Sequence, residues 1–211
     1  MAISFVSYAS ALSGSLTLPT HMAGDLILVH ACHESSIPGT ASGWQSPLST
    51  GGASMGGRLY FKIAASASET LPTISSTRIT QAAVYRSSDK GLHPTVATGA
   101  AASSSTISFN ATSAAATSFE GNSWSVGFGY CENSTATIND APTSWTNRGY
   151  NSDSTNNMAA FCVDFTSYAN ATKSLGVTIN NFGIHVGLIE VDNHNASGGG
   201  VPLIGTGGLV Y

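Results

Sequence analysis

The sequence contains very little charge. Only 9% of its 211 residues are Asp, Glu, Lys or Arg, against roughly a quarter in an average soluble domain. Disordered chains combine low hydrophobicity with high charge, and this chain shows neither property, because 42% of its residues are apolar. We therefore expect it to fold, with Ser, Thr, Ala, Gly and Asn covering its surface.

The scarcity of charge also limits the partners. Nucleic-acid binding needs clustered Lys and Arg, and the seven cationic residues here are scattered singly. No apolar run approaches the roughly 18 residues that cross a membrane. The first residues, MAISFVSYASALSG, lack the basic start and the apolar block of a signal peptide. The sequence therefore predicts neither nucleic acid nor a membrane as a partner, and synthesis in the cytoplasm.

Helical periodicity is missing as well. No long stretch repeats apolar residues about every 3.6 positions, whereas many short apolar segments lie between Gly, Pro, Asn and Ser. This pattern predicts an all-β sandwich or barrel with little helix. The predicted strands are Ile3–Tyr8, Gly14–Leu18, Leu26–His33, Arg58–Ala64, Thr70–Ile74, Arg78–Arg86, Val96–Thr98, Thr106–Phe109, Ser123–Glu132, Thr135–Ile138, Trp145–Tyr150, Met158–Phe165, Ser174–Ile179 and Ile184–Asp192.

Two stretches resemble each other, GDLILVHACHESSIPGTASGW at Gly24–Trp44 and NSWSVGFGYCENSTATINDAPTSW at Asn122–Trp145. Each passes from an apolar strand to a cysteine, then to a polar loop with a proline, and then to a tryptophan. Two copies are too few for an open repeat array, so we predict two similar halves that pair face to face. The expected fold is a jelly-roll β-sandwich of two antiparallel sheets. The spacing is 99 residues from Cys32 to Cys131, 101 from Trp44 to Trp145 and 100 from Phe61 to Phe161.

The sequence HACH, with His30, Cys32 and His33, suggests a metal site at first sight. On a strand, alternate residues share a face, so only His30 and Cys32 point the same way. A structural zinc site needs four ligands, and we therefore predict no metal. Three cysteines cannot all pair, and a disulfide between Cys32 and Cys131 is kept as a minor alternative.

Glu34 and Glu132 follow the two cysteines and could be paired as the carboxylates of a glycosidase. They equally mark the same junction of strand and loop in each half. The chain has no nucleophile elbow, no P-loop and no dinucleotide fingerprint. We therefore predict that the protein is not an enzyme and assign no catalytic residue, cofactor or metal ligand. Four N-x-S/T sequons are attributed to chance in so Asn-, Ser- and Thr-rich a chain, at Asn110, Asn133, Asn170 and Asn195.

Trp44 and Trp145 close the two long loops. Their matching positions predict that each is buried and anchors its loop. The alternative is a platform for stacking sugars, formed with Tyr60, Tyr130 and Tyr150.

The residues after Asp192, NHNASGGGVPLIGTGGLVY, differ from the rest of the chain. We divide the sequence into a β-sandwich domain, residues 1–192, and a glycine-rich C-terminal arm, residues 193–211. Glycines give such an arm reach and backbone freedom. A free tail does not need apolar side chains, although a disordered end is the alternative. The side chains predicted to dock on a neighbouring subunit are Val201, Leu203, Ile204, Leu209, Val210 and Tyr211.

Four motifs resemble a module of bacteriophage structural proteins, namely AGDLILV (Ala23–Val29), PGTASGW (Pro38–Trp44), GRLYFKIA (Gly57–Ala64) and AAVYR (Ala82–Arg86). PTSW and MAAFCVDF in the second half fit the usual layout of that module, so the resemblance spans Ala2 to Asp192. It implies a virion protein of head-decoration, fibre or tail type. The glycine-rich arm is not part of the shared pattern.

The resemblance and the composition together predict a non-catalytic virion subunit made in the host cytoplasm. Within the virion, a capsid decoration (cement) protein is favoured, which forms a homotrimer and docks on the major capsid protein. An uncharged surface and an apolar arm suit such packing between neighbours. The alternative is a tail-fibre or spike module that recognises host surface glycans.

Overall fold

The computed structural model describes residues 3–51, 55–88, 90–98, 102–110, 123–136, 138 and 140–191. This part of the chain contains no helix, and therefore none that could span a membrane. The strands are β1 (Ile3–Ala11), β2 (Leu26–His33), β3 (Gln45–Gly51), β4 (Gly56–Ile63), β5 (Ile79–Ser87), β6 (Gly91–Thr98), β7 (Ala102–Phe109), β8 (Ser123–Cys131), β9 (Thr146–Asp153), β10 (Met158–Phe165) and β11 (Ala171–Val191).

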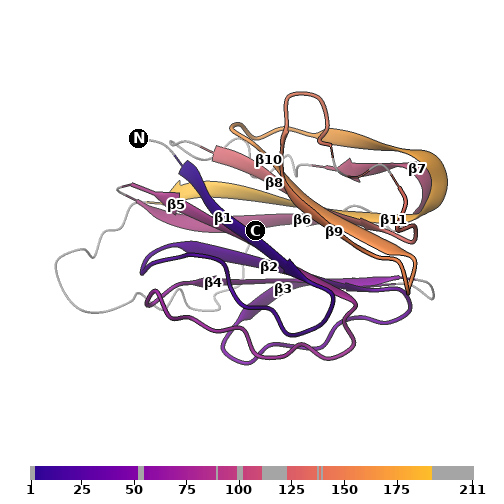
Figure 1. The fold of residues 1–211 in the computed structure, drawn as a ribbon. Coiled ribbons are helices and arrows are strands. Elements are labelled where there is room, and N and C mark those ends of the chain that lie inside the picture. The colour runs from indigo at the N-terminus through magenta and orange to yellow at the C-terminus, as the bar shows by residue number, and fades with distance from the viewer. Residues whose placement is uncertain are drawn as a thin grey trace, which may run out of the picture.

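The strands form two antiparallel sheets that lie face to face (Figure 1). Sheet A has the order β1-β5-β2-β4-β3, and sheet B has the order β6-β11-β8-β10-β9, with β7 paired to β11. The predicted all-β sandwich of two antiparallel sheets is thus confirmed. The jelly-roll topology is not, because the sheets have five and six strands and each takes all of them from one half of the chain.

The two sheets share one topology. β1, β2, β3, β4 and β5 occupy the same places in sheet A as β6, β8, β9, β10 and β11 in sheet B, and β7 is additional. Across the sandwich, β1 lies against β9, β3 against β6 and β5 against β10. This arrangement corresponds to a pseudo-two-fold axis between β2 and β8, so the halves pair face to face.

The repeated side chains point to different faces of the sheets in the two halves. Phe61 pairs with Leu28 and packs against the core between the sheets, whereas Phe161 pairs with Gly129 and lies on the outer face of sheet B. A shift of one residue along a strand exchanges its two faces. Cys32 and Cys131 likewise face different clusters, and all three cysteines are buried and free.

Both faces of both sheets are covered, which explains the continuous apolar runs of β2 and β10. The main core lies between the sheets, and further clusters lie on the outer faces of sheet A and sheet B. Three predicted strands turn out to be covering segments in these outer clusters, because an apolar residue that packs onto a sheet gives the same local pattern as a half-buried strand. They contain Leu16, Ile74 and Ile138.

Two further predictions differ from the structure. Gln45–Gly51 is not among the predicted strands, because its Gly, Ser and Pro content is typical of a loop, but it forms the edge strand β3. Ser174–Ile179 and Ile184–Asp192 were expected as two strands, and they are joined in the 21-residue β11, which curves at the right of Figure 1. The register of β11 is interrupted between Ser174 and Ile179, where Gly176 has a φ of 74°.

Four edge strands, β1, β3, β6 and β9, carry features that oppose the addition of another strand. Pro47 in β3 and Pro94 in β6 have no backbone N–H to donate. β1 has a bulge around Val6, and β9 has a bulge around Arg148, whose side chain points inward. Prolines, bulges and inward charges on edge strands block pairing between molecules. At these four edges the sandwich should therefore associate through side chains instead of by extending a sheet.

Replacing Gly129 by Ala should lower the free energy of unfolding by about 1–3 kcal/mol, because an added Cβ would lie 2.4 Å from the Phe161 ring. Urea titration followed by circular dichroism measures this loss. The double variant Gly129→Ala/Phe161→Leu should cost less than the sum of the two single changes. Additive losses would show that the two residues do not compete for the same space.

Candidate functional site

A polar cluster that we call the inter-sheet clasp joins the sheets beside β1 and β9. It consists of Phe5 and Tyr85 from sheet A, and of Arg148 and Asp164 from sheet B. Arg148 Nε donates to Asp164 Oδ2 at 2.7 Å, and Tyr85 Oη donates to the same oxygen at 3.0 Å. Arg148 Cζ lies 4.3 Å from the centroid of the Phe5 ring, within the range of a cation–π contact.

The clasp is buried, and burial controls its protonation. The Asp164 side chain is 1% exposed and the Arg148 side chain 22%. Desolvation raises the pKa of Asp164, while Arg148 and Tyr85 act in the opposite direction. Asp164 Oδ1 has no hydrogen-bond partner among the described residues. A carboxylate in this setting can hold the sheets together but is stabilised only in part.

The corresponding region on the other side of the pseudo-two-fold axis is apolar. Where β3 meets β6, Leu48, Phe61 and Val96 pack against the core. The clasp is thus a charged feature of one side of the sandwich, and the side related to it by the pseudo-two-fold axis lacks it. Buried ionic groups can serve to fix one unique packing.

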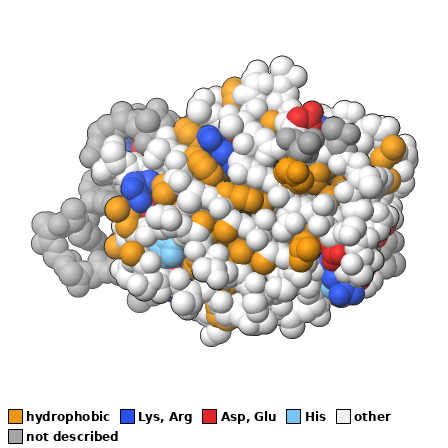
Figure 2. All heavy atoms as spheres, in the orientation of Figure 1, with side chains coloured by type: hydrophobic (Ala, Val, Ile, Leu, Met, Phe, Trp, Pro, Cys, Tyr) orange, Lys and Arg blue, Asp and Glu red, His pale blue; other side chains and the backbone are white. Residues whose placement is uncertain are grey.

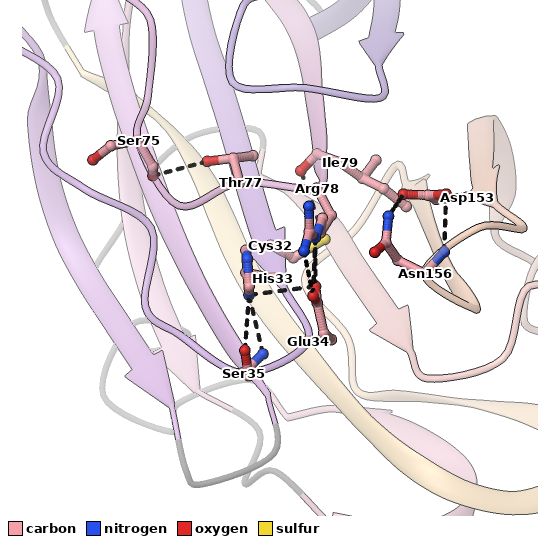
Figure 3. A network of polar contacts seen from close by, with 10 residues as sticks. All are labelled: Cys32, His33, Glu34, Ser35, Ser75, Thr77, Arg78, Ile79, Asp153 and Asn156. Carbon is pink, nitrogen blue, oxygen red and sulfur yellow. Dashed lines mark hydrogen bonds and ion pairs between the residues drawn. The ribbon is translucent and has the colours of Figure 1, made fainter.

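A second polar network lies at the end of the sandwich where β2 finishes, here called the Cys32 end (Figure 3). Arg78 holds Glu34 through Nε at 2.9 Å and Nη2 at 2.8 Å. His33 Nδ1 lies 3.3 Å from Glu34 Oε2 and accepts from the backbone N–H of Ser35 at 3.1 Å. Asp153 caps the turn between β9 and β10 by accepting from the backbone N–H of Thr155 at 3.0 Å.

At this end, Glu34 and Glu132 each accept hydrogen bonds that stabilise the local structure. The hydrogen bond from Arg78 lowers the pKa of Glu34, whereas the general acid of a glycosidase needs a raised one. Glu132 accepts from Asn180 Nδ2 at 2.7 Å. The two carboxylates therefore support the predicted strand-to-loop junctions, each within its own half.

Of the three candidate ligands in HACH, His30 and Cys32 share the inner face of sheet A, as predicted. His30 lies between the sheets, with Gln81 Nε2 at 3.0 Å from its Nδ1, and burial lowers its pKa to about 3. Cys32 Sγ donates to Ile79 O at 3.6 Å, and burial raises the pKa of this thiol. His33 lies at the strand end. Among the described residues, no group of three or more His, Cys, Asp or Glu could hold a metal.

Trp44 and Trp145 lie on the outer faces of sheet A and sheet B. Each ends its loop with a similar turn, since Trp44 N donates to Ala41 O at 3.1 Å and Trp145 N to Pro142 O at 2.9 Å. Trp145 also stacks on the rings of Phe109 and Phe165. Of the three tyrosines considered with them, Tyr60 and Tyr130 are buried and Tyr150 is exposed, so these aromatic residues do not form one surface.

The remaining predicted contact residues, Val201, Leu203, Ile204, Leu209, Val210 and Tyr211, lie outside the described part of the chain. The clasp, by contrast, was missed from the sequence. Asp164 interrupts the apolar run MAAFCVDF at a position that shares a face with Ala160 and Cys162. A carboxylate on the buried face of a strand is the signal that could have found it.

The comparisons with known proteins return no relative. No family model, no curated protein and no solved structure matches this chain.

Proposed function

We propose that this protein is a non-catalytic structural subunit of a bacteriophage virion. More narrowly, we propose a capsid decoration protein that forms homotrimers and docks on the major capsid protein. The motifs that resemble phage structural modules suggest the class. The surface of the folded molecule supports a role in a packed assembly.

The observation that carries the proposal is the pairing of the few charges within the molecule. At least five of the seven cationic side chains form internal ion pairs, so little charge remains to repel a neighbour. Figure 2 shows one face on which apolar side chains are scattered among uncharged polar ones, with few charged groups. The paired cations are Lys62, Arg78, Arg86, Arg148 and Lys173.

The closed architecture supports the same role. Each sheet is covered on both faces, and four edge strands, β1, β3, β6 and β9, carry features that oppose strand addition. Such a unit can pack beside copies of itself without fibrous growth through those edges. Its action would be mechanical, because buried area between subunits stabilises a shell, and lasting interfaces typically bury about 2,000 Å² or more.

Counting the copies of the protein in purified virions by quantitative mass spectrometry tests the proposal. A decoration protein should be present in hundreds of copies, on the order expected for a shell. A few tens or fewer would favour the alternative, a tail-fibre or spike module, which should then bind host cell envelopes as an isolated oligomer. Absence from the particle would contradict both roles.

A further inference from the structure

Arg58 differs from most cationic side chains of this protein, because no carboxylate in the described part of the chain holds it. Five of the seven Lys and Arg side chains bind a carboxylate. Arg58 makes one hydrogen bond to the described residues, from Nη1 to Ser46 Oγ at 3.4 Å, which is longer than is usual for an N–H···O bond. Since a guanidinium is always charged in proteins, this charge is uncompensated within the described subunit.

The fold holds the inner part of the Arg58 side chain beneath the surface. Tyr60, two positions further along β4, belongs to the outer cluster of sheet A, so Arg58 lies on the same outer face. The loop after β2 covers this face on both sides of Arg58. A Cβ on Gly56 would collide with the Ser36 carbonyl, and Tyr60 Oη donates to Gly39 O. Arg58 Nε is buried, with no hydrogen-bond partner among the described residues.

The outer end of the guanidinium lies beside the edge strand β3. Its Nη2 makes no hydrogen bond to a described residue and, unlike Nε, is not buried. Ser49 pairs with Arg58 across the ladder, so these two side chains point to the same face. Ser46 and Ser49 are both exposed. Arg58, Ser46 and Ser49, here called the Arg58 site, therefore bring N–H and O–H donors together at the surface.

The Arg58 site fits a carboxylate. Two N–H groups of a guanidinium match the two oxygens of a carboxylate in geometry as well as in charge. The hydroxyls of Ser46 and Ser49 can donate to the same oxygens. β3 and β4 contain no Asp or Glu, so no acidic side chain on these strands repels an incoming one.

We propose that the Arg58 site binds an acidic side chain of a second copy of this chain. This inference rests on the proposed function and names a contact between its subunits. The described residues of the same subunit bring no carboxylate within ion-pair distance of Arg58. With eleven acidic and seven cationic residues, every copy has more carboxylates than its own Lys and Arg side chains can pair. Pro47 opposes strand addition at the β3 edge, which leaves contacts between side chains.

The fold also prepares Arg58 for such a contact. Because its inner part is buried, less side-chain entropy is lost on binding than for an Arg that moves freely. Arg is among the residues that contribute most to protein–protein interfaces. The subunit itself gains no ion pair from Arg58 among its described residues, so removing the charge should weaken assembly and leave the fold intact.

The test uses the full-length protein and measures its mass by light scattering over a range of concentrations. Arg58→Met removes the charge and keeps an apolar side chain in place of the stem. The matched control, Lys62→Met, removes the same charge from the same face of β4, where Lys62 already binds Glu69 at 2.5 Å. Arg58→Lys keeps the charge but not the paired donors. Urea titration in dilute solution, followed by circular dichroism, measures the stability of each protein.

We expect Arg58→Met to need at least about a tenfold higher concentration than the wild type to assemble, with an unfolding midpoint no lower than that of the wild type. Lys62→Met should assemble as the wild type does, and Arg58→Lys should lie between the wild type and Arg58→Met. Sodium chloride screens a contact between charges, so added salt should weaken assembly of the wild type more than that of Arg58→Met.

Four results would overturn the proposal. Assembly of Arg58→Met at wild-type concentrations would reject this contact while leaving the proposed function standing. Equal weakening in Lys62→Met would mean that net charge, and not the Arg58 site, controls assembly. A lower unfolding midpoint in Arg58→Met that Arg58→Lys restores would show that Arg58 serves its own subunit. A wild-type protein that stays monomeric at every concentration would reject the second copy as the source of the carboxylate, and with it the homotrimer of the proposed function.

Discussion

Lowering the pH from about 7 to about 4 will strongly destabilise the protein, and His30 will account for much of the loss. Burial lowers the pKa of His30 to about 3, whereas a histidine in the unfolded chain has a pKa of about 6.5. Between these two pKa values, His30 is therefore protonated in the unfolded state and neutral in the folded state. Stability that is complete above pH ~6.5 is lost as the pH falls toward ~3, by about 1.4 kcal/mol for each pH unit.

The surroundings of His30 explain why its protonation is so unfavourable. Its ring lies between the sheets, 5.6 Å from the ring of Phe128 and 5.3 Å from that of Tyr130. Its contact to Gln81 is with a neutral amide, its Nε2 has no partner among the described residues, and burial is the cause of the lowered pKa. His185 adds to the effect, because burial lowers its pKa to about 4.

Urea titrations at several pH values measure the effect. His30→Gln keeps an amide beside Gln81 but cannot titrate. One proton fewer is then taken up on unfolding, so the loss of stability per pH unit should be smaller by about 1.4 kcal/mol. The control His93→Gln should change the slope less, because the His93 side chain is exposed, although desolvation also lowers its pKa. An unchanged slope in His30→Gln would contradict the prediction.

Replacing Arg148 by Met should lower the free energy of unfolding by about 2–4 kcal/mol at neutral pH. The change leaves the Asp164 carboxylate inside the sandwich with Tyr85 as its one hydrogen-bond donor among the described residues. Breaking a buried ion pair typically costs about 3–5 kcal/mol, and the 22% exposure of Arg148 lowers that figure through solvent screening.

The stability cost of Arg148→Met should depend on pH in the direction opposite to the destabilisation by His30. Desolvation raises the pKa of Asp164, so the folded state holds the proton at a higher pH than the unfolded state, whose value is about 3.9. The stability that protonation contributes is complete below the unfolded value and is lost as the pH rises through the folded one. The cost of Arg148→Met should therefore shrink in acid.

The double variant Arg148→Met/Asp164→Asn serves as the control for this site. It removes both charges while leaving an oxygen that can accept from Tyr85, so it should recover most of the stability lost in Arg148→Met. Losses that simply add would show that the two residues do not act as a pair. Chemical denaturation of the four proteins in one buffer series supplies the comparison.

The sequence by itself determined the fold class, because alternating and apolar runs between turn residues permit little except strands. The near-constant spacing of about 100 residues also indicated two similar halves, and the structure forms one sheet from each. Where strands have apolar side chains, as in β2, β8 and β10, the predicted bounds agree closely with the structure.

Only the tertiary structure decided which side chains meet. Local pattern cannot distinguish a strand from a segment that covers a sheet, so the stretches containing Leu16 and Ile74 were assigned wrongly. It cannot fix the facing of a strand either, because one residue of register exchanges the faces, and this separates Cys32 from Cys131. The clasp around Asp164 depends on the stacking of two sheets, since it joins Tyr85 to Asp164, which lie 79 positions apart in the chain.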